Sequence, residues 1–196
     1  MAELYPHFLN AAASQICLDG ANGVNLDQLF PLSGLSKQSF HSLFPDGRSV
    51  FLAVIENITL LQERQLQREL EGVSEPIERF VRSVTSGLSF AEANPHLSQA
   101  IAVAMFSNDM AIRERLEEVY ERHFARIAEE LASIGVIAEK SWKVITDIAP
   151  LLLSLTFLGS CPDLQMDYLA MVDYRRTALS LLDAFRKRFS AQSIAG

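Results

Sequence analysis

Apolar residues recur three and four positions apart along almost the whole of this 196-residue chain. That spacing places them on one side of an α-helix. Strand signals are nearly absent, because no turn dipeptide lies between alternating apolar and polar runs. The pattern therefore predicts an all-α protein.

Three short helices are predicted within residues 1–48. Two apolar stripes mark the first two helices: Leu4, Phe8, Ala12 and Ile16, then Leu26, Leu29 and Leu32. Gly20 ends the first helix, and Gly34, which can adopt a positive φ, separates the second helix from a third that Ser36 caps. Pro31 lies inside the second helix and removes a backbone hydrogen bond, so we expect this helix to be kinked or to start late.

A longer helix is predicted over residues 49–71, with Gly72 at its end. It links a small head, residues 1–48, to a larger helical body, residues 49–196. Ser74 is predicted to be the N-cap of the following helix, with Pro76 in its first turn.

Two further breaks divide the body. Asn94-Pro95 ends one helix and begins another, and "SNDM" at 107–110 precedes a long charged helix. After Ile148 the chain is apolar nearly all round a helix. Because 151–158 and 181–189 carry more apolar surface than a monomer leaves exposed, we expect a homodimer built on a four-helix bundle.

Residues 26–44 have the order of a helix-turn-helix motif. A bracing helix, a glycine turn and a second helix that begins with polar residues are its requirements. Lys37, Gln38, Ser39, His41 and Ser42 are predicted on the exposed side of the second helix, and Leu35, Phe40, Leu43 and Phe44 are predicted to anchor it. Small polar residues on a short helix are also found where the helix is merely solvated.

A longer stretch, residues 8–56, resembles the DNA-binding head of the TetR family of transcriptional regulators. The resemblance is carried by "GANG" at 20–23, "SGLSK" at 33–37 and "FHSLFPDG" at 40–47, and more loosely by "NPHLSQAIAVAMFSND" and "RERLEEVYERHFARIAEEL" in the body. It implies a three-helix head, a linking helix and an all-helical body that binds effectors and forms the dimer.

The resemblance also implies a mechanism and its residues. A homodimer places two recognition helices in successive major grooves of operator DNA, and a small molecule bound in the body changes their separation and releases the DNA. Asn25 and Ser36 would cap helices against phosphates and Arg48 would bind another phosphate, while the groove-facing residues would be Lys37, Gln38, Ser39 and His41.

An effector site is likewise implied by the resemblance. Aromatic side chains with a few polar groups suit a mainly apolar small molecule. The candidates are Phe80, Phe90, Met105, Phe106, Tyr120, Phe124, Trp142, Thr146 and Thr156.

The charge of the chain favours a second interpretation. The net charge is −7 and the pI about 5.1, so the surface as a whole repels polyanions. Residues 1–48 hold two basic residues, Lys37 and Arg48, against four acidic ones, a net of 2 − 4 = −2. Phosphate neutralisation supplies much of the affinity for DNA. The alternative is therefore a TetR-like fold kept as a sensor or interaction module with weakened or lost DNA binding.

Enzymatic and metal-binding motifs are not visible in the sequence. Cys17 and Cys161 lack zinc-site spacing, and no nucleophile-base pairing or glycine-rich phosphate loop accompanies the four histidines, so we expect no catalysis, no cofactor and no metal. No signal peptide and no apolar run long enough to cross a membrane is present. These features predict a cytoplasmic protein with reduced thiols and no membrane partner.

Overall fold

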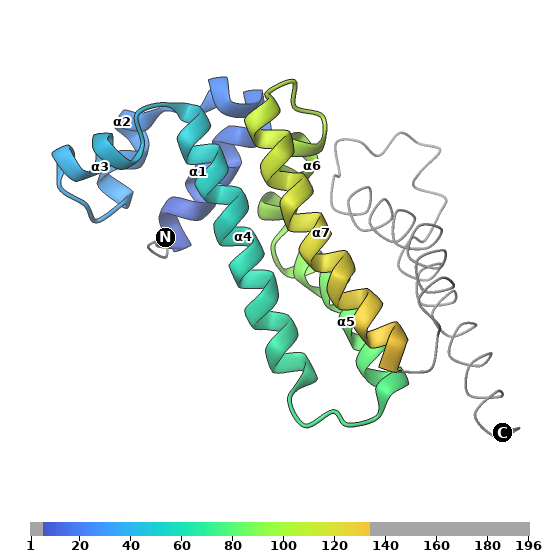
Figure 1. Ribbon diagram of the computed structural model, residues 1–196. Helices are drawn as coiled ribbons and strands as arrows, with labels where there is room; N and C mark the ends of the chain where they lie inside the picture. The colour runs from blue at the N-terminus through green and yellow to red at the C-terminus, as the bar shows by residue number, and fades with distance from the viewer. Residues whose placement is uncertain (1–5, 134–196) are drawn as a thin grey trace, which may run out of the picture. The chain divides into compact units, whose positions relative to one another are not determined.

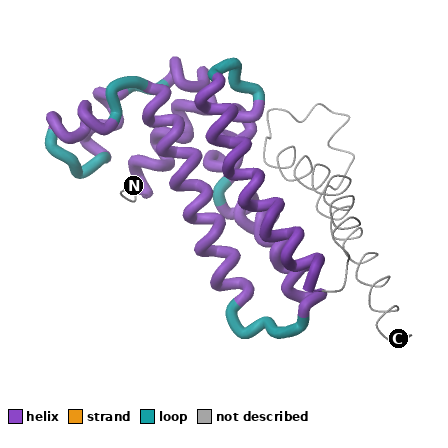
Figure 2. Tube along the Cα trace, viewed as in Figure 1, coloured by secondary structure: helices purple, strands orange, loops and turns teal. Residues whose placement is uncertain are grey.

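A computed structural model describes residues 6–133, apart from the side chains of Val84, Leu88, Phe124, Ile127, Ala128 and Leu131. Every regular element in this range is helical, as predicted (Figure 2). The elements are α1 (Pro6–Asp19), η1 (Gly20–Gly23), α2 (Leu26–Leu29), η2 (Phe30–Leu32), α3 (Lys37–Leu43), α4 (Gly47–Leu70), α5 (Pro76–Ala93), α6 (Pro95–Met105) and α7 (Met110–Ser133) (Figure 1). The two η elements are short 3₁₀ helices.

The described residues fall into two compact units. The first unit takes in the chain up to Glu63 together with Asn94–Tyr120, and the second takes in Arg64–Ala93 together with the part of α7 from Glu121. Helices α4 and α7 therefore contribute residues to both units. None of the described helices combines the length and apolarity needed to cross a lipid bilayer.

The first unit is built around α1. Three of the four residues of its predicted apolar side are buried, with Phe8, Ala12 and Ile16 at 0% exposure, and the fourth, Leu4, lies outside the described residues. Helix α1 packs against α6, and near its end the Cys17 thiol donates a hydrogen bond to the His96 carbonyl oxygen at 3.6 Å. Burial of this side removes apolar surface from water and is the main stabilising term for so short a helix.

Pro31 acts differently from the expectation. Helix α2 starts at Leu26 without delay, because Asn25 caps it, and the α-helical turn ends at Leu29. The chain then continues as the 3₁₀ helix η2, whose first turn holds Pro31. The first N–H groups of a helix have no partner within it, so Pro31 occupies a position where its missing N–H removes nothing. The prediction of a late start was wrong, and the predicted distortion is a change of helix type.

The predicted breaks in the remaining helices are largely confirmed. Helix α4 ends at Leu70 just before Gly72, which has φ +73°, and Asn94-Pro95 separates α5 from α6. The predicted cap of α5 was wrong by one residue. Glu75, not Ser74, accepts hydrogen bonds, from the backbone N–H groups of Ile77 at 3.0 Å and Glu78 at 2.6 Å. A carboxylate at a helix start also complements the positive end of the helix dipole.

Candidate nucleic-acid interface

Helix α2 is positioned by hydrogen bonds from two side chains, those of Asn25 and Gln15. The Asn25 side-chain oxygen accepts a hydrogen bond from the Gln28 backbone N–H at 3.1 Å, as a cap does. Gln15 of α1 accepts from the Asn25 backbone N–H at 2.8 Å and donates to the Gln28 side chain at 3.1 Å. The start of the bracing helix is thereby tied to α1.

The turn between α2 and α3 has a defined backbone. Gly34 has φ +65°, the left-handed conformation predicted for it. Just before it, the Ser33 hydroxyl donates to the Phe30 carbonyl oxygen at 2.7 Å and accepts from the Leu35 N–H at 3.2 Å. Ser36 then caps α3 by accepting a hydrogen bond from the Ser39 N–H at 3.2 Å, which confirms the predicted cap. These bonds set the angle at which α3 leaves α2.

Four phenylalanines anchor α3. Phe40 and Phe44 are 0% and 2% exposed, and both rings contact Phe8 of α1, with centroid separations of 6.2 and 5.4 Å. Phe30 of η2 contacts Phe40 at 5.5 Å. The prediction that Phe40 and Phe44 anchor the helix is thus confirmed. It was wrong for the two leucines, because Leu35 and Leu43 are 37% and 46% exposed.

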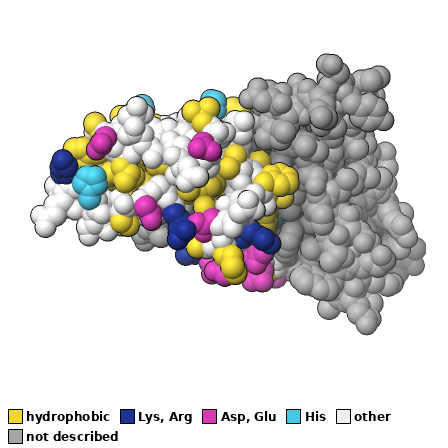
Figure 3. Space-filling model, turned by 90° about the horizontal axis from the view of Figure 1, so that it is seen from above, with side chains coloured by type: hydrophobic (Ala, Val, Ile, Leu, Met, Phe, Trp, Pro, Cys, Tyr) yellow, Lys and Arg dark blue, Asp and Glu magenta, His cyan; other side chains and the backbone are white. Residues whose placement is uncertain are grey.

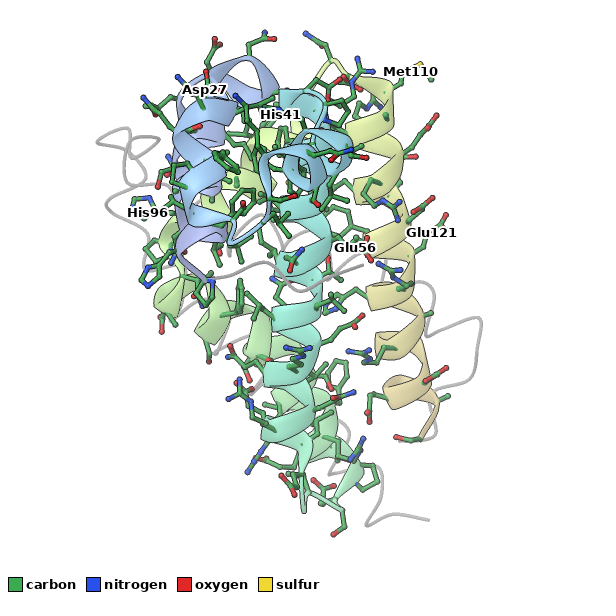
Figure 4. All side chains as sticks on the ribbon, turned by 90° about the vertical axis from the view of Figure 1, so that its left-hand side faces the viewer. Asp27, His41, Glu56, His96, Met110 and Glu121 are labelled. Atoms are coloured by element: carbon green, nitrogen blue, oxygen red, sulfur yellow. The ribbon has the colours of Figure 1, made fainter. Side chains whose placement is uncertain are left out.

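The opposite side of α3 is open and polar. All five side chains predicted there are exposed: Lys37, Gln38, Ser39, His41 and Ser42. Figure 4 labels His41 on α3 and Asp27 on α2, the two helices of the motif. The structure therefore brings Lys37, Gln38, Ser39 and His41 together on one short helix, with Ser36 as its N-cap and Asn25 as the N-cap of α2.

The start of α4 lies against the turn that follows α1. A Cβ placed on Gly47 would meet the Ala21 carbonyl oxygen at 2.1 Å and Val24 Cβ at 3.1 Å, so the backbones approach too closely for any side chain. Asp46 caps the helix by accepting the Ser49 N–H at 2.8 Å, and this hydrogen bond holds the pKa of Asp46 below its usual value. Head and linking helix are locked together at this point.

Arg48, the remaining predicted DNA-binding residue, has a partner within the protein. Its Nε–H donates to Asp109 Oδ2 at 2.5 Å, across 61 positions of sequence. The Arg48 side chain keeps 57% exposure. The sequence provides no local signal for this ion pair, because Asp109 belongs to the turn before α7.

Positive charge is sparse on this candidate interface. Lys37 and Arg48 are the only lysine and arginine in residues 6–48. Figure 3 shows a face on which blue side chains are few over the head. Within residues 6–48, these two cations and the helix N–H groups are the only groups suited to attract a phosphate backbone.

The predicted effector residues are distributed over both units. Phe80 and Phe90 are buried on α5, in the second unit. Of the first-unit residues, Met105 and Phe106 are 39% and 81% exposed, and burial raises the pKa of the Tyr120 phenol, which stays protonated. The side chain of Phe124 is not among those described, and three further candidates lie outside the described residues altogether: Trp142, Thr146 and Thr156. The predicted dimer helices at 151–158 and 181–189 also lie outside the described residues.

Sequence reasoning missed a set of buried polar residues in the second unit. Ser83 and Ser86 of α5 are 2% and 4% exposed, and within the described chain the Ser83 hydroxyl has no hydrogen-bond partner. Glu130 of α7 is 9% exposed and accepts two hydrogen bonds from Arg79, at 3.0 and 3.3 Å. Only Ser83 has a signal in the sequence: its helical spacing from Phe80 and Phe90 places it on the same side of α5 as these two apolar residues. No group of three metal-ligand side chains is placed to hold an ion in residues 6–133.

No family model and no curated protein matches this sequence. Solved structures do match. A proposed TetR-family transcriptional regulator from Rhodococcus sp. superposes with a TM-score of 0.70 at 16% identity, over 90% of this chain and 95% of that one. A proposed transcriptional regulator from Saccharomonospora viridis, solved in complex with choline, superposes with a TM-score of 0.62 at 19% identity, over 78% of this chain and 83% of that one. A protein of unknown function from Rhodococcus sp. RHA1 gives 0.63 at 20% identity over 91% of each chain.

These similarities define the class of fold. The chain has the all-helical fold of TetR-type transcriptional regulators, as its sequence resemblance implies.

Proposed function

We propose that this protein is a transcriptional regulator that binds operator DNA as a homodimer and is released by a small, mainly apolar effector. The observation that carries the proposal is the α2–α3 motif: both helix caps are formed, the phenylalanine anchor is buried, and the polar side of α3 is open. In a helix-turn-helix protein that side enters the major groove. The fold shared with TetR-type regulators supports the same conclusion.

Each residue has a role in the proposed complex. Lys37, Gln38, Ser39 and His41 face base edges, and Asn25 and Ser36 direct helix N–H groups toward phosphates. Residues 1–48 form the DNA-binding head and residues 49–196 the effector-binding and dimerisation body. Two heads in one dimer must match half-sites about 34 Å apart, one turn of the duplex.

The direct test is equilibrium titration of the purified protein against its own upstream DNA at several salt concentrations. We expect preference for one sequence, with a shallow dependence of affinity on salt because the head has few cations. Absence of any sequence preference even at low salt would contradict DNA reading. Sedimentation at micromolar concentration tests the dimer, and a monomer there would contradict the proposed mechanism.

The effector part of the proposal rests on the second unit and on one similar structure. Phe80 and Phe90 supply apolar surface on α5, and Ser83 adds a buried hydroxyl that a ligand could satisfy. The Saccharomonospora viridis structure holds choline, a small cation with an apolar shell. Choline is therefore the first probe in a thermal-shift screen of mainly apolar compounds. Failure of every compound to raise the melting temperature would count against an effector.

One observation favours the alternative, a TetR-like sensor with weakened or lost DNA binding. Of the two cations in residues 6–48, one is already paired with a carboxylate of the same chain. Under this alternative the effector would still bind and the DNA titration would show no preference. The two measurements together distinguish the two functions.

A further inference from the structure

The ion pair between Arg48 and Asp109 joins two helices of the first unit. Arg48 lies in the first turn of α4, and Asp109 immediately precedes α7. The Asp109 side chain is 21% exposed and that of Arg48 is 57% exposed. The guanidinium thus extends over accessible surface to reach a more buried carboxylate.

The two oxygens of Asp109 have separate partners. Oδ1 accepts a hydrogen bond from the Ala111 backbone N–H at 3.0 Å, at the start of α7, and Oδ2 accepts from Arg48. The Asp109 backbone N–H also donates to the Ser107 hydroxyl at 3.2 Å. The turn holds this carboxylate in place independently of Arg48.

A carboxylate and a phosphate oxygen accept the same charge-assisted hydrogen bond from a guanidinium. The Arg48 Nε–H that donates to Asp109 cannot donate to a phosphate in the same geometry. The negative charge of Asp109 also cancels most of the electrostatic attraction between Arg48 and a polyanion that is farther away than the distance between the two paired charges.

We propose that Asp109 is an intramolecular latch that withholds Arg48 from the DNA backbone, so that opening the pair adds one phosphate contact per head. This inference rests on the proposed DNA binding. Since only Lys37 and Arg48 carry fixed positive charge in residues 6–48, the latch removes one of the two cations of the interface. It accounts for a head that has the structure of a DNA reader and little charge with which to bind.

The test compares the wild type with Asp109→Asn in DNA titrations between 50 and 200 mM salt. Asparagine retains an oxygen to cap α7 and loses the charge that holds Arg48. We expect the slope of log affinity against log salt to become steeper by about 0.9 for each head bound. The affinity advantage of the variant should then grow about 3.5-fold per head from 200 to 50 mM salt.

A matched control exists on the same two helices. Glu56, labelled on α4 in Figure 4, has its Oε2 atom 3.4 Å from Nη1 of Arg115 of α7. Arg115 also pairs with Glu118 at 2.8 Å, so Glu56→Gln removes one negative charge and leaves both Arg115 and Arg48 paired. We expect the wild-type slope from this variant. The double variant Arg48→Gln/Asp109→Asn should lose the steeper slope, because the cation that makes the new contact is gone.

Failure of the latch can be told apart from failure of the proposed function. Phosphate contacts carry no sequence information, so the difference in slope is also expected on a duplex of unrelated sequence. Lack of sequence preference would reject the regulator; an unchanged slope in Asp109→Asn, or an equal increase in Glu56→Gln, would overturn the latch. Without DNA, the NMR chemical shift of the Arg48 Nε–H should differ from that of an unpaired arginine in the wild type. It should return to the value of an unpaired arginine in Asp109→Asn. Absence of that difference would also overturn the latch.

Discussion

The head and the α5–α7 pair of the second unit are stabilised by different kinds of contact. In the head, four phenylalanine rings pack on the buried side of α3, and a glycine at the start of α4 lies against a backbone carbonyl oxygen. In the second unit, Arg79 joins α5 to α7 through Glu130, and two serines are buried on α5. Steric fit holds α3 in one orientation, whereas in the second unit an ion pair joins two helices. Packing therefore fixes the position of a helix in the first region, and charge contributes to it in the second.

The largest expected effect is on the head, in the variant Phe40→Ala. Removal of a fully buried ring that contacts Phe8, Phe30 and Phe44 should lower the free energy of unfolding by about 3–5 kcal/mol. Denaturant unfolding measures the loss, and hydrogen exchange locates it. Protection should fall first in α1–α3 while α5 changes little. Equal loss of protection in α5 would contradict the separation of the two regions.

Gly47→Ala should also destabilise the head, by about 1–3 kcal/mol, because its Cβ would meet the Ala21 carbonyl oxygen at 2.1 Å. Thermal unfolding provides the measurement. Should the variant be as stable as the wild type, the close approach of α4 to the turn after α1 would be disproved.

The matched control for Gly47 lies in the second unit. At Gly87 of α5 a Cβ would meet no described atom within 4 Å. Gly87→Ala should therefore stabilise the protein by about 0.5–1 kcal/mol, since alanine loses less backbone entropy in a helix. The two glycine-to-alanine substitutions should therefore change the free energy of unfolding in opposite directions, a loss at Gly47 and a gain at Gly87.

Apart from the control variants, the smallest expected destabilisation is that of Glu130→Gln in the second unit. In the wild type the Arg79 guanidinium donates to both carboxylate oxygens of Glu130. Glutamine would offer only one acceptor oxygen and would leave Arg79 without its counter-charge. Because the Arg79 side chain is 36% exposed and can be rehydrated, we expect a loss of about 1–2 kcal/mol, less than for a fully buried pair. Urea unfolding gives the value. Glu78→Gln, which affects an exposed pair with Arg82, serves as the control and should lose under about 1 kcal/mol.

The outcome of the predictions depended on how far apart in sequence the determining residues lie. The cap by Ser36 and the turn at Gly34 were predicted correctly, because a cap or a positive φ involves only neighbouring residues. The cap by Asn25, which the family resemblance implies, is also formed. The predicted exposure of the polar side of α3 was correct for the same reason. The anchor was predicted in part: Leu35 and Leu43 follow the helical pattern, but no partner covers them fully.

By itself, then, the sequence determined the helices in residues 6–133, most of their ends and the polar side of α3, since these follow from hydrogen bonds and periodicity within a few residues. Only the tertiary structure decided that Gly47 must lack a side chain, that Arg48 bonds to Asp109, and that Glu130 receives Arg79. Each of those contacts joins segments separated by more than 20 residues. Such contacts depend on which surfaces meet when the chain folds, and local pattern carries no information about that meeting.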